Sequence, residues 1–167
     1  MIGSVLATLD FEASSLAMES YPIEVGIAVG PRDGGDPDSW SSLIRPTATW
    51  VSEGEWDLDA QAVHGISKEQ LGGGLSPRRV MEELNARLPE GSVVLCDGGA
   101  YDPMWLRKLA AAARIQAAFQ LWDLRAAFVL DRRRLDRCTA ALAGDRAEHR
   151  AGGDSLRLWR AVQAAMR

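Results

Sequence analysis

Strand-forming sequence is concentrated in the first 45 residues of the chain, and this limits the folds that the chain can adopt. Ser4–Phe11 alternates as a strand does, and Tyr21–Val29 is rich in β-branched residues. Trp40–Arg45 follows a loop of Pro, Asp and Gly residues, a composition typical of turns. Three consecutive strands joined by turns predict an antiparallel meander.

From Asp57 onward the periodicity is helical, with two short strands between the helices. Gly65 is expected to end a first short helix, and a serine and a proline begin the next one. The predicted elements after that first helix are a helix from Ser76-Pro77 to about Leu88, a strand Ser92–Cys96, a helix from Asp102 to about Arg114, a strand Ala118–Trp122, and helices beyond it with loops near Asp131 and Gly144. We therefore predict an α/β fold, with a mixed five-stranded sheet (antiparallel meander plus parallel strands) flanked by helices, in a single domain over residues 1–167.

Composition narrows the class of protein further. With 47% hydrophobic and 25% charged residues in 167, the chain can bury a core and is neither disordered nor collagen-like. No apolar run approaches the roughly 20 residues that span a bilayer, and Asp10 and Glu12 interrupt the N-terminal apolar stretch. Cys96 and Cys138 form neither a disulfide framework nor a zinc motif. We expect a cytoplasmic protein with reduced thiols.

Charge is distributed unevenly along the chain. Residues 1–100 carry 16 acids and 6 bases, whereas residues 101–167 carry 7 acids and 13 bases. A basic half suits a protein that binds a polyanion while acids elsewhere hold metal. The alternative is that the arginines, Arg132–Arg134 among them, only solvate helix faces.

Asp10 and Glu12 share one face of the predicted first strand, because residues two apart point the same way. They lie toward its carboxyl end, where ligands gather in open α/β sheets. Two carboxylates this close repel each other unless a cation lies between them. The alternative is two solvated acids at an exposed strand end.

Asp102 and Asp154 each begin a predicted helix, where a plain capping role is the alternative to chemistry. Asp102 falls on the apolar face of its helix, so its carboxylate is expected to point toward the sheet. Asp154 follows two glycines, which allow close backbone approach, and His149 precedes it by five residues. An exposed loop histidine is the alternative for His149.

Together these residues predict a metal site. Ligation by oxygen alone selects Mg²⁺ or Mn²⁺ over zinc or copper. Two such ions about 4 Å apart can activate a water and stabilise a leaving oxygen at phosphorus. The imidazole of His149 is suited to accept the proton of that water.

The same residues resemble the motifs of the DEDDh 3′–5′ exonucleases, the DnaQ-like group within the ribonuclease H-like fold. Leu9–Glu12 resembles their Asp-x-Glu motif, and Tyr101-Asp102 before a helix resembles the second motif. His149–Asp154 resembles the third, His-x-x-x-x-Asp, and Ala62–Ser67 is similar to a segment between the first two. The resemblance covers nearly the whole chain in the right order.

The resemblance implies a function and a role for each residue. Asp10, Glu12, Asp102 and Asp154 would hold two Mg²⁺ or Mn²⁺ ions, with His149 as general base. The substrates would be 3′ ends of single-stranded DNA or RNA, hydrolysed to nucleoside 5′-monophosphates. The terminal nucleotide would be held by residues of two segments: Ala13, Ser14, His64, Gly65 and Ile66. No membrane partner is implied, and a homodimer is left open.

One departure from the family pattern concerns the substrate. Asp97-Gly98 stands where the family usually has His-Asn, and an extra acid there could repel a phosphate or recruit metal. Gly98 and Gly99 are expected to loosen this turn. This departure leaves a first alternative, a catalytically weak module that binds nucleic-acid ends. The basic, arginine-rich C-terminal half leaves a second, a module that docks on a larger polymerase or nuclease.

Overall fold

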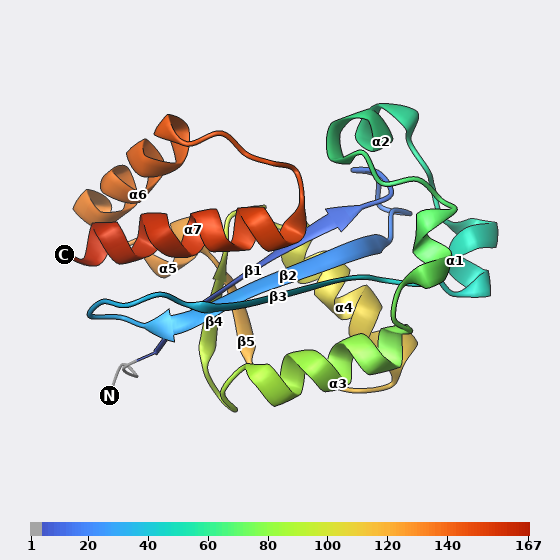
Figure 1. Ribbon diagram of the computed structural model, residues 1–167, viewed down its shortest axis with the longest axis horizontal. Coiled ribbons are helices and arrows are strands. Elements are labelled where there is room, and N and C mark those ends of the chain that lie inside the picture. The colour runs from blue at the N-terminus through green and yellow to red at the C-terminus, as the bar shows by residue number, and fades with distance from the viewer. Residues whose placement is uncertain (1–4) are drawn as a thin grey trace.

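One five-stranded sheet organises the computed structural model, which describes residues 5–167 (Figure 1). β1 (Val5–Ala13), β2 (Pro22–Pro31) and β3 (Asp38–Leu43) form an antiparallel meander, as predicted. β4 (Val93–Cys96) and β5 (Gln120–Asp123) run parallel to β1 on its other side, giving the order β3-β2-β1-β4-β5. The predicted mixed sheet is confirmed; Ser4 lies outside the described residues.

Helices cover both faces of this sheet. α7 (Ala151–Met166) lies across one face with α6 (Arg132–Gly144) beside it, while α3 (Pro77–Arg87) and α4 (Tyr101–Ala113) pack on the other (Figure 1). The remaining helices are short: α1 (Ala48–Glu53), α2 (Leu58–His64), η1 (Gln70–Gly73, a 3₁₀ helix) and α5 (Leu124–Ala127). None of the helices within residues 5–167 is long and apolar enough to cross a membrane.

The two-residue period of β1 divides its side chains between these two layers. Leu9 and neighbouring apolar residues of β1 enter the core formed with α3 and α4. Leu6 enters the core beneath α7, and the Thr8 hydroxyl donates to the Ser155 carbonyl of α7 at 2.7 Å. Asp10 and Glu12 therefore continue the α7 face of β1, beyond the point where apolar residues fill it.

Local signals in the middle of the chain are largely confirmed. Gly65 ends α2 in the left-handed conformation at φ 69°. Ser76 caps α3 through the Arg79 N–H. The short helix α1 was not predicted from the sequence: it begins at the Thr47 cap and has only six residues, too few for a helical period to be visible.

Candidate functional site

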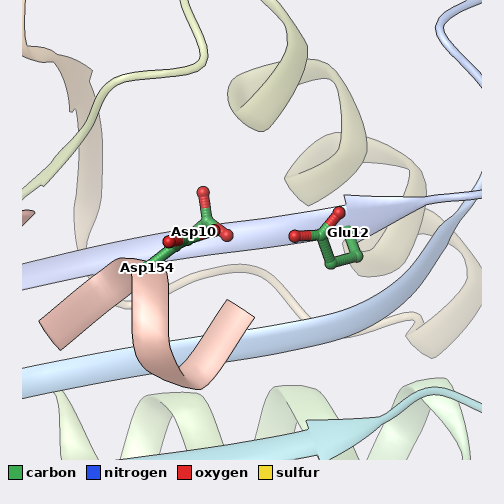
Figure 2. A group of neighbouring side chains, drawn as sticks. All are labelled: Asp10, Glu12 and Asp154. Carbon is green, nitrogen blue, oxygen red and sulfur yellow. The ribbon is translucent and has the colours of Figure 1, made fainter. Parts of the chain in front are cut away.

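Asp10, Glu12 and Asp154 converge at one place between β1 and α7. Each offers a carboxylate oxygen, and the three oxygens lie within 4.8 Å of one another. Figure 2 shows Asp10 and Glu12 on the strand and Asp154 on the first turn of α7, directed into the same space. Residues 144 positions apart in the sequence thus form one cluster, called here the carboxylate triad.

Burial and mutual repulsion make the triad electrostatically unfavourable on its own. Burial, and then the charges of Asp102 and Glu12, raise the pKa of Asp10 well above its usual value. Burial, and then the charges of Asp154 and Glu24, raise the pKa of Glu12 to about 8. A divalent cation would relieve this repulsion, and an all-oxygen donor set matches the ligands that Mg²⁺ and Mn²⁺ take. The triad could therefore hold a metal ion.

Asp102 is buried beside the triad, with 1% of its surface exposed. Its Oδ2 accepts a hydrogen bond from the Gly98 N–H at 3.0 Å. Burial raises the pKa of Asp102 to about 7 despite that hydrogen bond. The prediction that this carboxylate points inward is confirmed, but α4 begins at Tyr101 with Ala100 as its cap, so Asp102 is not the capping residue.

The turn before α4 is anchored rather than loose. The Gly98 N–H is held by Asp102 and the Gly99 N–H by Asp123 Oδ2, each at 3.0 Å. A Cβ on residue 98 would lie 2.5 Å from Asp102 Oδ2, so glycine is required for this approach. The expectation that Gly98 and Gly99 loosen the turn is wrong, because two carboxylates bind its N–H groups. Asp97 lies half-buried next to it, and burial raises its pKa.

His149 lies on the loop that leads into α7. Asp154 accepts the N–H groups of Glu148 at 3.0 Å and of His149 at 2.9 Å, which fixes the loop backbone. His149 has a left-handed backbone, φ 54°, and its side chain is exposed. It adjoins a cavity of about 510 Å³ that Val63 of α2 also lines. α7 begins at Ala151, earlier than the start near Asp154 that the sequence predicts.

The residues proposed to hold a nucleotide occupy a second layer around the end of β1. Ala13 and Ser14 are buried, and the Ser14 hydroxyl accepts the Tyr21 N–H at 3.0 Å. Ile66 is 1% exposed and belongs to a small core with Tyr21, whereas Gly65 is exposed. The side chains of Ser14 and Ile66 therefore support the backbone rather than face solvent.

His64, the remaining residue of that group, is buried but incompletely hydrogen-bonded. Its Nδ1 accepts the Ile66 N–H at 3.0 Å, whereas its Nε2 has no partner among residues 5–167. Burial lowers the pKa of His64, which favours the neutral ring. A neutral ring with one unsatisfied nitrogen can form a hydrogen bond to a ligand.

The arginines of α6 give little support to a polyanion site at that helix. Arg132 pairs with Asp136 at 3.0 Å and Arg134 with Asp131 at 3.3 Å, and the four side chains are between 43% and 81% exposed. Such pairs are typical of a solvated helix face.

Glu24 was not identified from the sequence. It is 3% exposed on β2, directly opposite Glu12, and is bound by Arg150 at the start of α7. The available signal was a single acid within the otherwise apolar run Ile23–Val29.

These features define an α/β protein with a carboxylate triad where a strand meets the first turn of a helix. Comparisons with protein-family models and with curated proteins found no match. These comparisons therefore place the chain in no family.

Proposed function

We propose that the chain is a metal-dependent 3′–5′ exonuclease of the DEDDh type, on a ribonuclease H-like fold. The observation that carries the proposal is the carboxylate triad, with three oxygens within 4.8 Å and Asp102 buried beside it. Nothing in the packing of the sheet requires acids at these positions, and their burial costs stability. A hydrolytic metal site gives these acids a use.

Asp10, Glu12 and Asp154 would hold the metal, and Asp102 would complete the set for a second ion. Bound Mg²⁺ or Mn²⁺ would supply charge neutralisation and Lewis acidity at the scissile phosphate. His149 would accept the proton of the attacking water. The water oxygen would form a new bond to phosphorus, and the bond from phosphorus to the 3′ oxygen would break. The products are a nucleoside 5′-monophosphate and a shortened strand that ends in a 3′ hydroxyl.

The terminal nucleotide would lie between α2 and the loop before α7. Val63 of α2 is 56% exposed and lines the same cavity as His149. Its side chain would offer an apolar surface to the terminal nucleobase. Stacking on such a surface is tolerant of sequence, since every base has a π-face. His64 Nε2 offers a hydrogen-bonding group near this end of α2.

The test is digestion of 5′-labelled single-stranded DNA and RNA of matched sequence in Mg²⁺ or Mn²⁺. Stepwise shortening is expected, abolished by a chelator and by Asp10→Ala. Asp136→Ala, which removes an exposed acid of α6, is the matched control and is expected to retain activity.

Intact substrate in both metals, with folded wild-type protein, would overturn the proposal. Calorimetric titration with Mg²⁺ and Mn²⁺ would then separate the remaining alternatives. No metal uptake at millimolar concentration favours a module that only binds nucleic-acid ends.

A further inference from the structure

We propose that Glu24 and Arg150 act as a positioning pair that holds residues 148–154 in register with the acids of β1. These residues are the end of the loop before α7 and the first turn of α7, and are together called here the His149 loop. This pair is called here the Glu24–Arg150 clamp. The proposal rests on the proposed function, because the loop matters for catalysis only if His149 and Asp154 act in hydrolysis.

The first support is the hydrogen bonding of Glu24, which binds two successive residues of the loop. Arg150 Nε donates to both carboxylate oxygens, at 3.2 and 3.0 Å, and Arg150 Nη2 also donates to Oε1. The Ala151 N–H donates to Oε2 at 2.9 Å. Ala151 is the first residue of α7, and its N–H is one of those that a helix leaves unpaired. Arg150 makes no side-chain cap of its own, so Glu24 caps α7 from β2, 127 residues away.

The second support is the position of the clamp relative to Glu12. Glu12 and Glu24 are direct partners in the antiparallel pairing of β1 with β2. Opposite partners point to the same face with Cβ atoms about 5 Å apart. Two carboxylates side by side would repel, and the Arg150 guanidinium compensates one of them. The strand pair that presents Glu12 therefore also fixes the start of α7.

The third support is close backbone packing beneath the loop. A Cβ on Gly26 of β2 would lie 2.1 Å from the Ala151 carbonyl oxygen, and a Cβ on Gly152 would lie 2.9 Å from Ser41 Oγ. Residues 151 and 152 thus lie directly on β2 and β3, with no room for an intervening side chain. Gly152, two residues before Asp154, therefore permits the close approach of the α7 backbone to the Ser41 side chain.

The loop is consequently held at two points on either side of the His149 side chain. Asp154 holds the N–H groups of Glu148 and His149, and Glu24 holds Arg150 and Ala151. Releasing the second point would let His149 and Asp154 shift relative to Asp10. A displacement of about 1 Å can reduce turnover by about 10²-fold without weakening substrate binding equally.

The test compares kcat and KM of Arg150→Met, Arg150→Lys, Glu24→Gln and the double variant Glu24→Gln/Arg150→Met. Trp159→Phe is the matched control, since it removes a buried hydrogen bond from α7 to the Leu6 carbonyl but does not touch the loop. Arg150→Met is the main variant because the Arg150 side chain is half exposed, so its replacement is tolerated better than loss of the buried Glu24.

We expect Arg150→Met and Glu24→Gln each to lower kcat about 10- to 100-fold with KM changed less than about threefold. The double variant should be no worse than the poorer single variant, because both break one contact. Arg150→Lys keeps the charge but not the planar fork, so partial rescue is expected. Unchanged kcat in Arg150→Met, or an equal loss in Trp159→Phe, would overturn the clamp.

Amide hydrogen exchange gives a readout that does not depend on hydrolysis. The Glu148 and His149 amides should exchange roughly tenfold faster in Arg150→Met but at the wild-type rate in Trp159→Phe. Wild-type protein that hydrolyses nothing would overturn the proposed function, while faster exchange in Arg150→Met would still support the clamp. Unchanged exchange would overturn the clamp, whatever the activity.

Discussion

The two halves of the site are held in place by different means. Asp10 and Glu12 lie on β1, whose backbone pairs with β2 on one side and β4 on the other. His149 lies on the loop before α7 and Asp154 on the first turn of that helix, and carboxylate hydrogen bonds hold this segment in place. Substitution on β1 therefore changes mainly the charge of the site, whereas substitution around the loop also changes its geometry.

The carboxylates of Asp10 and Asp154 also differ, in the hydrogen bonds that they accept. No hydrogen bond from another side chain or backbone group of residues 5–167 reaches Asp10, whose pKa is raised by burial and neighbouring acids. Asp154 accepts two backbone N–H groups. Asp10 therefore adds repulsion without compensation, whereas we expect the two hydrogen bonds of Asp154 to outweigh the repulsion that it exerts on Glu12.

The sharpest test of this difference is to neutralise one acid in each half. Asp10→Asn should reduce hydrolysis by about 10³-fold or more, the equivalent of several kcal/mol of transition-state stabilisation. It should also raise the melting temperature of the metal-free protein, because it removes a half-buried charge that neighbouring acids repel. Asp154→Ala should abolish hydrolysis as well, yet lower stability by about 1 kcal/mol through loss of its cap-like hydrogen bonds.

Kinetics with oligonucleotides and thermal unfolding in chelator measure both effects. The same sign of stability change in Asp10→Asn and Asp154→Ala would contradict the distinction between the two halves.

Replacing His149 separates chemistry from backbone conformation in the loop half. Loss of a general base typically costs about 10²-fold or more in kcat, so His149→Ala and His149→Gly should both fall by that amount. Because residue 149 has φ 54°, glycine should be more stable there than alanine, by about 1 kcal/mol. Denaturant unfolding of the two variants measures this difference. Activity near the wild-type level in His149→Gly would exclude His149 as the base.

The sequence predicted the β1 half better than the loop half, for a physical reason. The two-residue period of β1 is a local property, and it placed Asp10 and Glu12 on one face; the helical period likewise placed Asp102 toward the interior. The start of α7 depends instead on Glu24, a partner 127 residues away. A cap supplied by another strand leaves no local pattern, so Asp154 was taken as the first residue of its helix.

The turn before α4 shows the same limit. Glycines indicate conformational freedom when only the sequence is considered, but the carboxylates of Asp102 and Asp123 bind the N–H groups of Gly98 and Gly99. Asp123 is the last residue of β5, and only the parallel pairing of β4 with β5 brings it to this turn. Strand pairing of this kind cannot be deduced from local composition.

The pH dependence of stability tests the charge of the β1 half without a substrate. The folded-state pKa of Glu12 is raised from 4.5 to about 8, so the folded protein binds more protons than the unfolded chain between these values. Stability of the metal-free protein should therefore fall as pH rises from about 4.5 to about 8, and level off above. Mg²⁺ binds the deprotonated carboxylates, so the stabilisation that it adds should grow over the same interval.

Thermal unfolding with Mg²⁺ or with chelator, at several pH values, measures this effect. Glu12→Gln should flatten the pH dependence in chelator. A stability that rises with pH between 5 and 8 in wild-type protein and not in this variant would contradict the assigned cause.

The smallest effect is expected at Asp97, which lies next to the anchored turn and outside the carboxylate triad. Asp97 is not one of the three acids whose carboxylate oxygens lie within 4.8 Å of one another, so we expect it to act on the β1 half as a neighbouring charge rather than as a ligand. Asp97→Asn should leave metal affinity within about threefold, since a screened charge outside the ligand set contributes about 1 kcal/mol or less.

The same variant should lower KM for a single strand by a similar factor at low salt, because one negative charge near the proposed path of the phosphates is removed. This decrease in KM should vanish at high salt. Calorimetric Mg²⁺ titration and KM at two ionic strengths measure the two effects. A loss of metal affinity above tenfold would make Asp97 a ligand and move the turn before α4 into the metal site.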